Sequence, residues 1–286
     1  MISAGVAIII PTYNRATFLR GAVDSALGQT KRCDVIVVDH GSTDSTPEVA
    51  KSFPTEVTYL RRERDLGVHF CWLEGVLSTN AEYVKILFDD DLLGPTFVEN
   101  SLALMAPDTG FVMSRARTID RVSGEKIESF FSLNGLNTGI FRIRSRVGRR
   151  VRKMMISPSA IFLRRKDALD ALYQGDLPLQ TKSYKGVGPD HFMKLLTCLR
   201  YRNFGFINEE LVEFGVHPTS ITIDAHADSN SLEALQSAYR EVEFFARTLE
   251  LSLPIYLLRA RVIEAGPWTA FRGLIVQVKN FFRGRK

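Results

Sequence analysis

The segment that decides the fold is Val6-Ala-Ile-Ile-Ile-Pro-Thr-Tyr-Asn-Arg15. Its first half is a continuous apolar run ended by Pro11, which predicts a strand buried on both faces. Apolar residues then recur at helical spacing over residues 16–27, and Asp34-Val-Ile-Val-Val38 has the composition of a second buried strand. A buried strand, a helix and another buried strand predict a βαβ unit and a parallel sheet.

The same alternation continues through the first hundred residues. Short strands are predicted over residues 57–60 and 83–88, and helices over residues 66–77 and 95–105. A further helix is predicted to begin at Ser45, which can cap it, with Glu48 placed to complete a capping box. The pattern predicts the α/β class, with helices on both faces of a mainly parallel, Rossmann-like sheet.

The second half of the chain is less regular. Strands are predicted over residues 111–117, 141–146, 159–163 and 211–216, and helices over residues 166–173 and 190–200. From residue 229 onward the pattern is helical to the end, with breaks expected near Pro254 and at Gly266-Pro267.

Composition excludes several classes of protein. The chain has 286 residues, of which 45% are hydrophobic, and a net charge of +5, values that do not fit a disordered protein. No apolar run approaches the ~20 residues of a membrane-spanning helix, and the first ten residues do not have the pattern of a secretory signal. The cysteines, Cys33, Cys71 and Cys198, are far apart, so reduced thiols in a cytoplasmic protein are expected.

The net charge is unevenly distributed. Residues 142–153 carry seven basic side chains and no acidic one, and residues 259–286 carry seven basic side chains and one acidic one. The rest of the chain holds 23 basic against 31 acidic side chains, so its net charge is −8. A nucleic-acid binder would be basic more uniformly, so no nucleic-acid partner is expected.

Polar residues follow three predicted strands, at the edge where parallel strands end and ligands bind. They are Pro11-Thr-Tyr-Asn-Arg15, Asp39-His-Gly-Ser-Thr-Asp44 and Asp89-Asp-Asp91. Three adjacent carboxylates repel one another unless a cation lies among them, and oxygen ligands suit Mg²⁺ or Mn²⁺ on substrate phosphates. A solvated turn before the next helix is the alternative. Asp39 can likewise accept hydrogen bonds from a nucleobase or ribose, or form a turn.

The three motifs, in this order and at these intervals, resemble family-2 glycosyltransferases of the GT-A fold. The resemblance is close over residues 5–105 and looser over residues 106–220. It implies a GT-A sheet and the transfer of a sugar from a nucleotide-sugar, usually UDP-linked, with inversion at the anomeric carbon. It also implies that residues 1–105 bind the nucleotide-sugar and that residues 106–225 bind the acceptor within the same domain. Beyond residue 220 there is no resemblance, and the helical pattern predicts that residues 226–286 are a C-terminal helical extension.

The resemblance assigns residues to the donor site. The implied nucleotide-sugar-binding residues are Pro11, Thr12, Tyr13, Asn14, Arg15, Asp39, Asp65, Asp89 and Asp90. The implied ligands of Mn²⁺ or Mg²⁺ on the diphosphate are Asp90, Asp91 and His217. The sequence departs from the family pattern at Phe88, where many members have the first Asp of the acidic motif, and at Asp65, where they have Asn.

The resemblance also implies a general base. An inverting transfer needs a group that takes the proton of the acceptor hydroxyl from ~3 Å away. The family has an Asp at the start of a late helix, and Gly188-Pro-Asp190 matches it, with Pro189 in place of the usual Glu. Without the resemblance, Asp190 would be interpreted as a favourable charge at a helix N-terminus.

The cationic segments do not belong to these motifs. Arg142, Arg144 and Arg146 alternate along a predicted strand, so one face can meet an anionic acceptor or lipid phosphate, or lie in water on a hairpin. Residues 268–286 combine an apolar stripe with basic residues, which fits an interfacial helix on an anionic membrane or a helix packed on the catalytic domain. The expected partners are a nucleotide-sugar donor, a glycan or lipid-linked acceptor, and the inner face of the plasma membrane through residues 268–286.

Two other functions share some of these features. A nucleotidyltransferase acting on sugar phosphates would need a Gly-rich loop after the first strand, and Pro11-Thr-Tyr-Asn-Arg15 contains no Gly. A catalytically inactive GT-A adaptor that binds membrane or polyanion would explain Phe88, Asp65 and Pro189. The resemblance to the family favours a metal-dependent, inverting glycosyltransferase of bacterial surface polysaccharide or glycolipid synthesis.

Overall fold

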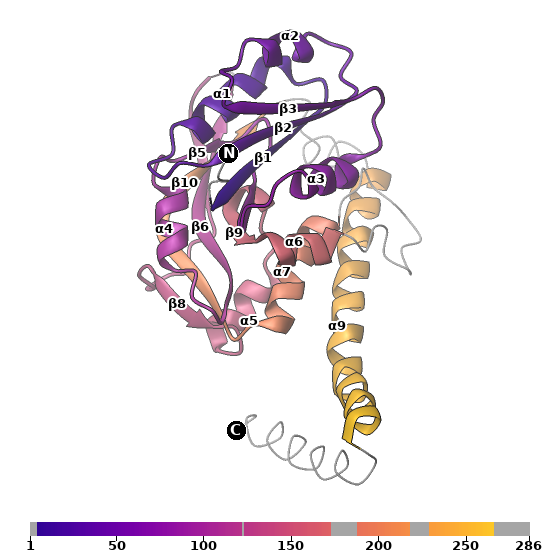
Figure 1. Cartoon of the computed structure of the whole chain (residues 1–286). Coiled ribbons are helices and arrows are strands. Elements are labelled where there is room, and N and C mark those ends of the chain that lie inside the picture. Colours follow the sequence, from indigo (N-terminus) through magenta and orange to yellow (C-terminus); the bar gives the residue numbers. More distant parts are fainter. Residues whose placement is uncertain (1–4, 122, 173–187, 218–228, 266–286) are drawn as a thin grey trace. The chain divides into compact units, whose positions relative to one another are not determined.

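The computed structural model describes residues 5–121, 123–172, 188–217 and 229–265, with side chains up to residue 252. A central sheet carries helices on both faces (Figure 1), so the expected α/β class is confirmed. The chain divides into two compact units, residues 1–242 and residues 243–286. No helix in the described ranges is long and apolar enough to cross a membrane.

The first half of the chain builds the parallel part of the sheet. Strands β1 (Val6–Thr12), β2 (Asp34–His40), β3 (Val57–Arg62) and β4 (Tyr83–Ile86) lie in the order β3-β2-β1-β4, and each neighbouring pair is parallel. Helices α1 (Ala16–Leu27), α2 (Thr46–Lys51) and α3 (Val68–Leu77) connect them. Every residue of β1 is buried, as its apolar run predicts for a strand covered on both faces.

The second half adds mostly antiparallel pairs. Strand β9 (Ile161–Arg164) lies antiparallel between β4 and β6 (Thr109–Asp120), whereas β6 is parallel to β10 (Asn203–Val216). The short strands β5 (Leu92–Leu93) and β8 (Gly139–Arg142) pair with β10, and β7 (Lys126–Phe130) pairs with β6. Parallel pairing is therefore confined to the first four strands and to the β6–β10 pair.

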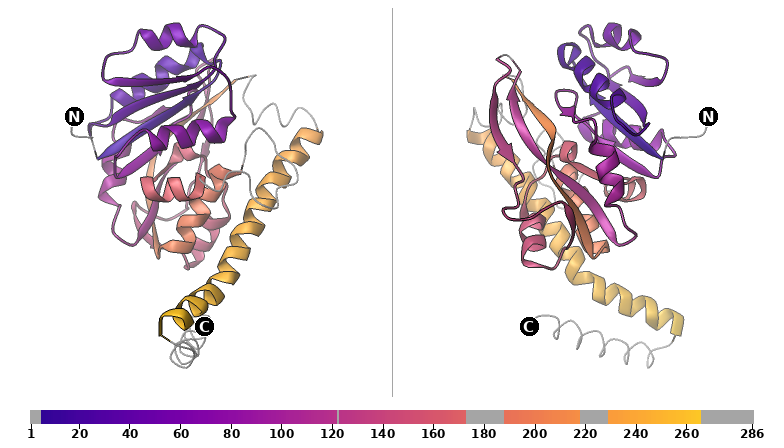
Figure 2. Two further views of the ribbon diagram at one scale, coloured as in Figure 1. Left: turned by 45° about the vertical axis from the view of Figure 1, so that its right-hand side comes forward. Right: turned by 90° about the vertical axis from the view of Figure 1, so that its left-hand side faces the viewer.

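The helices form two layers. Helices α1 and α4 (Phe97–Ala103) pack on one face of the sheet, and α3, α6 (Arg165–Leu172) and α7 (Pro189–Arg200) on the other. Figure 2 shows the sheet and its helices from two further sides. The described residues also form α5 (Arg146–Lys153), the short 3-10 helix η1 (Pro158–Ala160) and α9 (Ser229–Ala265).

The strand predicted over residues 141–146 is wrong in its second half. Strand β8 ends at Arg142, and α5 begins at Arg146. Ser145 caps this helix, because its Oγ accepts a hydrogen bond from the Gly148 amide at 3.1 Å. Arg142, Arg144 and Arg146 therefore do not share one face of a strand.

Two further local predictions differ from the structure. Ser45 is the N-cap residue of α2, as expected, but its side chain makes no capping bond; Asp44 Oδ1 instead accepts from the Thr46 amide at 2.9 Å. No break occurs near Pro254, because α9 continues from Ser229 to Ala265. A proline removes one backbone hydrogen bond of a helix, and the helix continues on both sides of it. The break expected at residues 266–267 and the segment 268–286 lie outside the described residues.

Candidate active site

Hydrogen bonds join the loops that follow β1 and β2. The Asn14 amide donates to Ser42 Oγ at 2.9 Å, and Asn14 Oδ1 accepts from the Thr43 amide at 2.7 Å. Asn14 has a left-handed backbone with φ of 55°, a conformation that asparagine tolerates better than most residues. Asn14, expected in the donor site, thus uses its side chain to hold two strand-end loops together.

Asp39 is fully buried at the end of β2. Its Oδ2 accepts from the Tyr59 hydroxyl at 2.6 Å, and its Oδ1 accepts from the Ser42 amide at 2.9 Å. The strand register places Thr12 and Arg61 on either side, and Arg61 Nε lies 3.5 Å from Oδ2. A buried carboxylate paired in this way keeps further lone pairs for an N–H or O–H group of a nucleoside.

The other expected donor residues lie in different surroundings. Pro11 and Thr12 are buried at the end of β1, whereas Tyr13 is 47% exposed. Arg15 is the N-terminal flanking residue of α1. Asp65 lies in an exposed turn before α3, where its Oδ1 accepts from the Gly67 amide at 2.7 Å. The structure therefore brings Pro11, Thr12 and Asp39 together and uses Asp65 to close a turn.

The three carboxylates after β4 differ in exposure. Asp89 and Asp91 are buried, whereas the side chain of Asp90 is 17% exposed. Asp91 Oδ1 accepts from the Gly215 amide at 3.1 Å, which ties the acidic segment to the end of β10. Asp90 is the member of the triplet with the most access to a ligand.

Asp90 meets His217, which directly follows β10. His217 Nε2 lies 3.0 Å from Asp90 Oδ2, and the imidazole is buried and stacked on Phe18 with ring centroids 4.4 Å apart. The Arg121 guanidinium donates to the Asp90 carbonyl at 2.9 Å. Strand ends from the two halves of the chain thus bring a carboxylate and an imidazole to one point.

Burial and a neighbouring charge raise the pKa values of Asp89 and Asp91. Burial and the charge of Asp90 raise the pKa of Asp89 well above its ordinary value, and the same two causes raise the pKa of Asp91 to about 8. The positive charges of Arg15, near Asp89, and Lys85, near Asp91, offset part of this effect. A divalent cation at Asp90 would stabilise the same carboxylates as anions.

Phe88 takes part in packing. Its ring stacks on Trp72 with centroids 5.7 Å apart, and its amide donates to Ser159 Oγ at 3.1 Å. The position where many family members carry a carboxylate is therefore filled by an aromatic contact with α3.

Asp190 lies in the first turn of α7. Its Oδ1 accepts from the Gly188 amide at 2.9 Å, its Oδ2 accepts from the Tyr239 hydroxyl at 3.2 Å, and burial raises its pKa. A Cβ on Gly110, at the start of β6, would contact Thr197 near the end of α7, so this end of the helix packs on the start of β6. Asp190 lies at the other end of the same helix.

A family comparison agrees with this arrangement. Residues 7–171 match the family described as Glycosyl transferase family 2. The chain belongs to this family. The expected family membership is confirmed, and its motifs at the ends of β1, β2 and β4 fall within the matched residues.

Relatives of this family 2 chain match it over part of their length. An uncharacterized glycosyltransferase of Rickettsia typhi is 38% identical over 101 residues, which cover 35% of this chain and 31% of the relative. Chondroitin synthase of Escherichia coli is 30% identical over 142 residues, which cover 48% of this chain and 21% of the relative. The chain thus spans less than a third of the length of these relatives.

Solved structures share the fold at low identity. TarS 1–349 of S. aureus in complex with UDP-GlcNAc has a TM-score of 0.59 and 14% identity, with 87% of this chain and 75% of that chain covered. Mannosyltransferase PcManGT from Pyrobaculum calidifontis, in complex with GDP-Man and Mn²⁺, has a TM-score of 0.52 and 18% identity, with 98% and 81% covered. The expected GT-A type of fold is confirmed.

The metal-ligating atoms at this site fit a cation that is coordinated partly by the protein and partly by a substrate. Asp90 and His217 offer a carboxylate oxygen and an imidazole nitrogen at one point, a pair that suits Mn²⁺. Among residues 5–265 as far as they are described, no group of three or more His, Cys, Asp or Glu side chains could hold a metal ion alone. Mg²⁺-type sites commonly use one or two protein ligands, with waters and substrate phosphates completing the coordination.

Several residues of the site were not predicted from the sequence. Tyr59 and Arg61 contact Asp39, Arg121 holds the Asp90 carbonyl, and Tyr239 contacts Asp190. The register of neighbouring parallel strands could have placed Arg61 beside Asp39. Arg121 and Tyr239 have no local sequence signal, because each meets its partner across the tertiary structure.

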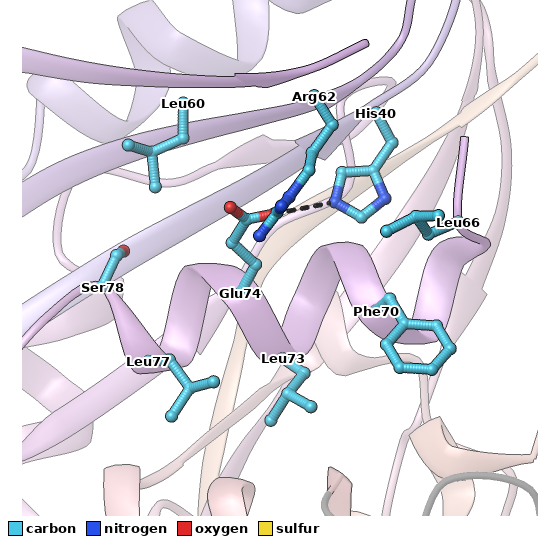
Figure 3. A pocket seen from close by; sticks show the side chains of 9 residues that line it. All are labelled: His40, Leu60, Arg62, Leu66, Phe70, Leu73, Glu74, Leu77 and Ser78. Atoms are coloured by element: carbon cyan, nitrogen blue, oxygen red, sulfur yellow. Dashed lines mark hydrogen bonds and ion pairs between the residues drawn. The ribbon is translucent and has the colours of Figure 1, made fainter. Parts of the chain in front are cut away.

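A separate hollow of about 450 Å³ lies between β3 and α3 (Figure 3). His40 Nε2 lies 3.1 Å from Glu74 Oε2, and Arg62 Nε donates to the same oxygen at 2.8 Å. His40 follows Asp39 in β2, so their side chains point to opposite faces of the sheet. This hollow is therefore distinct from the strand-end site.

Proposed function

We propose that this chain is an inverting glycosyltransferase that moves a sugar from a nucleoside-diphosphate sugar, preferably a UDP-sugar, to a hydroxyl acceptor. The observation that carries the proposal is the convergence of Asp90 and His217 at 3.0 Å, at the same sheet edge as the buried Asp39. Family membership and the fold shared with nucleotide-sugar complexes support it.

The nucleoside is proposed to bind at the ends of β1 and β2. Asp39 is held by Tyr59 and the Ser42 amide, so its carboxylate is fixed before a ligand arrives. An acceptor-only group in a fixed position selects a donor such as the imide N–H of uracil or a ribose hydroxyl. Proteins of similar fold have been solved in complex with UDP-GlcNAc or GDP-Man. The first comparison to make is therefore the stability of this chain with and without UDP.

In the proposed reaction, the acceptor oxygen attacks the anomeric carbon from the side opposite the diphosphate. Asp190 takes the hydroxyl proton, and the bond from the anomeric carbon to the diphosphate oxygen breaks with its electron pair remaining on the diphosphate. Attack from the opposite side inverts the anomeric configuration. A divalent cation, when bound, stabilises the charge on the leaving group. Asp90 and His217 would hold Mn²⁺ or Mg²⁺, with Asp91 fixing the segment through Gly215.

The acceptor is proposed to be a glycan or lipid-linked glycan of a bacterial surface polysaccharide or glycolipid. Relatives named chondroitin synthase and GlyA, a glycosyltransferase of Streptococcus pneumoniae, support this class. Peripheral membrane contact is proposed through residues 268–286, whose basic and apolar residues suit an anionic surface. Sedimentation with anionic vesicles tests it: neutralising Arg272, Lys279 and Arg283 should release the protein, and unchanged binding would count against the contact.

The proposed function is tested by donor binding and turnover. A thermal-shift screen of nucleotide-sugars with and without Mn²⁺ should find a donor that raises the melting temperature, because a ligand of the folded state stabilises it. Asp90→Asn and Asp190→Asn should each abolish UDP release, and the Asp190 variant should still bind UDP with Mn²⁺. Normal turnover in both variants would refute the assignment.

The assay also separates the two alternative functions. Release of pyrophosphate from a nucleoside triphosphate would support a nucleotidyltransferase. Absence of UDP binding with Mn²⁺ at high protein concentration in calorimetry would favour an inactive adaptor.

A further inference from the structure

The first part of α9 packs against the N-terminal turn of α7. The Tyr239 hydroxyl lies 3.2 Å from Asp190 Oδ2, and the Tyr239 ring meets the His191 ring edge to face with centroids 5.9 Å apart. Val242, one turn further along α9, is buried, and a Cβ on Gly188 would lie 3.0 Å from its Cγ2. Three contacts therefore fix one segment of α9 on the turn that carries Asp190.

The hydrogen bonds of Asp190 show what Tyr239 adds. Oδ1 accepts from the Gly188 amide at 2.9 Å, a bond made within the helix cap. Oδ2 accepts from Tyr239, a bond made from another helix. The other hydrogen bonds to the carboxylate come from amides of its own helix turn, so Tyr239 supplies the one side-chain donor in this set. With Tyr239 in place, the orientation of the carboxylate is set by anchors from two different helices.

We propose that Tyr239 is the positioning residue of the general base, fixing the Asp190 carboxylate so that Oδ2 is presented to the acceptor hydroxyl. The inference rests on the proposed role of Asp190 as the base. It extends the catalytic machinery into α9, which lies beyond the family match of residues 7–171. Tyr239 acts through Asp190, and its own hydroxyl proton is not transferred.

The neighbouring groups give this contact a measurable signature. Burial raises the pKa of Asp190, and the hydrogen bonds from the Gly188 and His191 amides and from Tyr239 lower it in part. Burial and the charge of Asp190 raise the pKa of Tyr239, so the phenol remains a donor. His191, on the same turn, stays neutral, because burial and the charge of Lys194 lower its pKa to about 3. Loss of the Tyr239 hydroxyl should therefore raise the pKa of Asp190 further.

The test is Tyr239→Phe in the full chain, which keeps the ring against His191 and removes only the hydroxyl. We expect kcat to fall about tenfold near neutral pH, because a hydrogen bond to a charged group is lost. The acidic limb of the pH profile of kcat/KM should move to higher pH, so that part of the activity returns as pH rises. The KM for the donor should remain unchanged, since Tyr239 contacts the base.

Tyr201→Phe is the matched control. The Tyr201 hydroxyl donates to Asp167 Oδ2 at 2.8 Å, so this variant also loses a tyrosine–aspartate bond, between the end of α7 and α6. It should lower the melting temperature without moving the pH profile.

Separate results overturn the inference and the proposed function. A Tyr239→Phe enzyme with wild-type kcat, or with lower kcat and an unmoved pH profile, would overturn the positioning role. If Asp190→Asn retained turnover, the assignment of the base would be wrong and the inference would fail with it. An inactive Asp190→Asn with a normal Tyr239→Phe would remove the inference alone.

Discussion

Asp90 and His217 are 127 positions apart in the sequence, and their side chains meet with 3.0 Å between Oδ2 and Nε2. The contact joins the end of β4 to the end of β10, strands from opposite halves of the chain. Buried carboxylates with raised pKa values lie on either side of Asp90, and a cation bound there would favour their ionised forms.

His217→Ala is expected to weaken Mn²⁺-dependent binding of UDP at least about tenfold, because one of the two proposed protein ligands is removed. Binding of UDP without metal should change little. Calorimetry with and without Mn²⁺ measures both. His40→Ala is the control, since its imidazole pairs with Glu74 in the separate hollow and should leave the metal effect intact. Equal metal dependence in the two variants would argue against His217 as a ligand.

Gly215→Ala should distort the segment that carries Asp90. A Cβ at this position would lie 2.2 Å from the Asp90 carbonyl oxygen and 2.7 Å from Arg121 Nε. Forcing in a methyl group of this kind costs roughly 1–3 kcal/mol of unfolding free energy, and activity should fall with it.

Urea unfolding and UDP release measure the two effects of Gly215→Ala. Gly139→Ala is the control, because its Cβ would meet only Phe141 at an ordinary 3.7 Å. If Gly215→Ala had wild-type activity and stability, the close approach of the two loops would be contradicted.

Tyr59→Phe should weaken donor binding by about fivefold, because Asp39 loses the hydroxyl that orients its carboxylate. The affinity for UDP, measured by calorimetry, is the relevant readout, and kcat at saturating donor should be little changed. Tyr83→Phe removes a hydroxyl at the opposite end of the sheet from the site and should bind UDP normally. An unchanged affinity of Tyr59→Phe for UDP would count against Asp39 as part of the proposed nucleoside site.

His191 makes stability depend on pH. Burial and Lys194 lower its pKa from 6.5 to about 3 in the folded chain. Between these values the unfolded chain binds a proton that the folded chain does not, so the free energy of unfolding decreases as pH falls through this window. His191→Gln should flatten the decline of melting temperature between pH 6.5 and pH 4. The same slope in both proteins would show that another group controls acid unfolding.

Local patterns predicted the first half of the molecule well. Helix α1 was predicted over residues 16–27 and has those bounds, and the runs that follow Gly5 and Cys33 form β1 and β2. These elements are recognisable because strands buried on both faces require continuous apolar runs and helices require apolar residues every three to four positions. Errors arose where one side chain decides the outcome, as with Ser145 at the start of α5 and Asp44 at the start of α2.

The sequence by itself determined the α/β class, the polar motifs at three strand ends and the resemblance to the family, because each depends on residues that are close together in the chain. The resemblance had already grouped His217 with Asp90, which the structure brings into contact. Only the tertiary structure decided that Tyr59 meets Asp39 and that Tyr239 meets Asp190. Such pairs depend on the packing of elements that are distant in sequence, and no local pattern records that packing. The motifs therefore predicted which edge of the sheet carries the candidate site, and the tertiary structure determined which side chains are in contact.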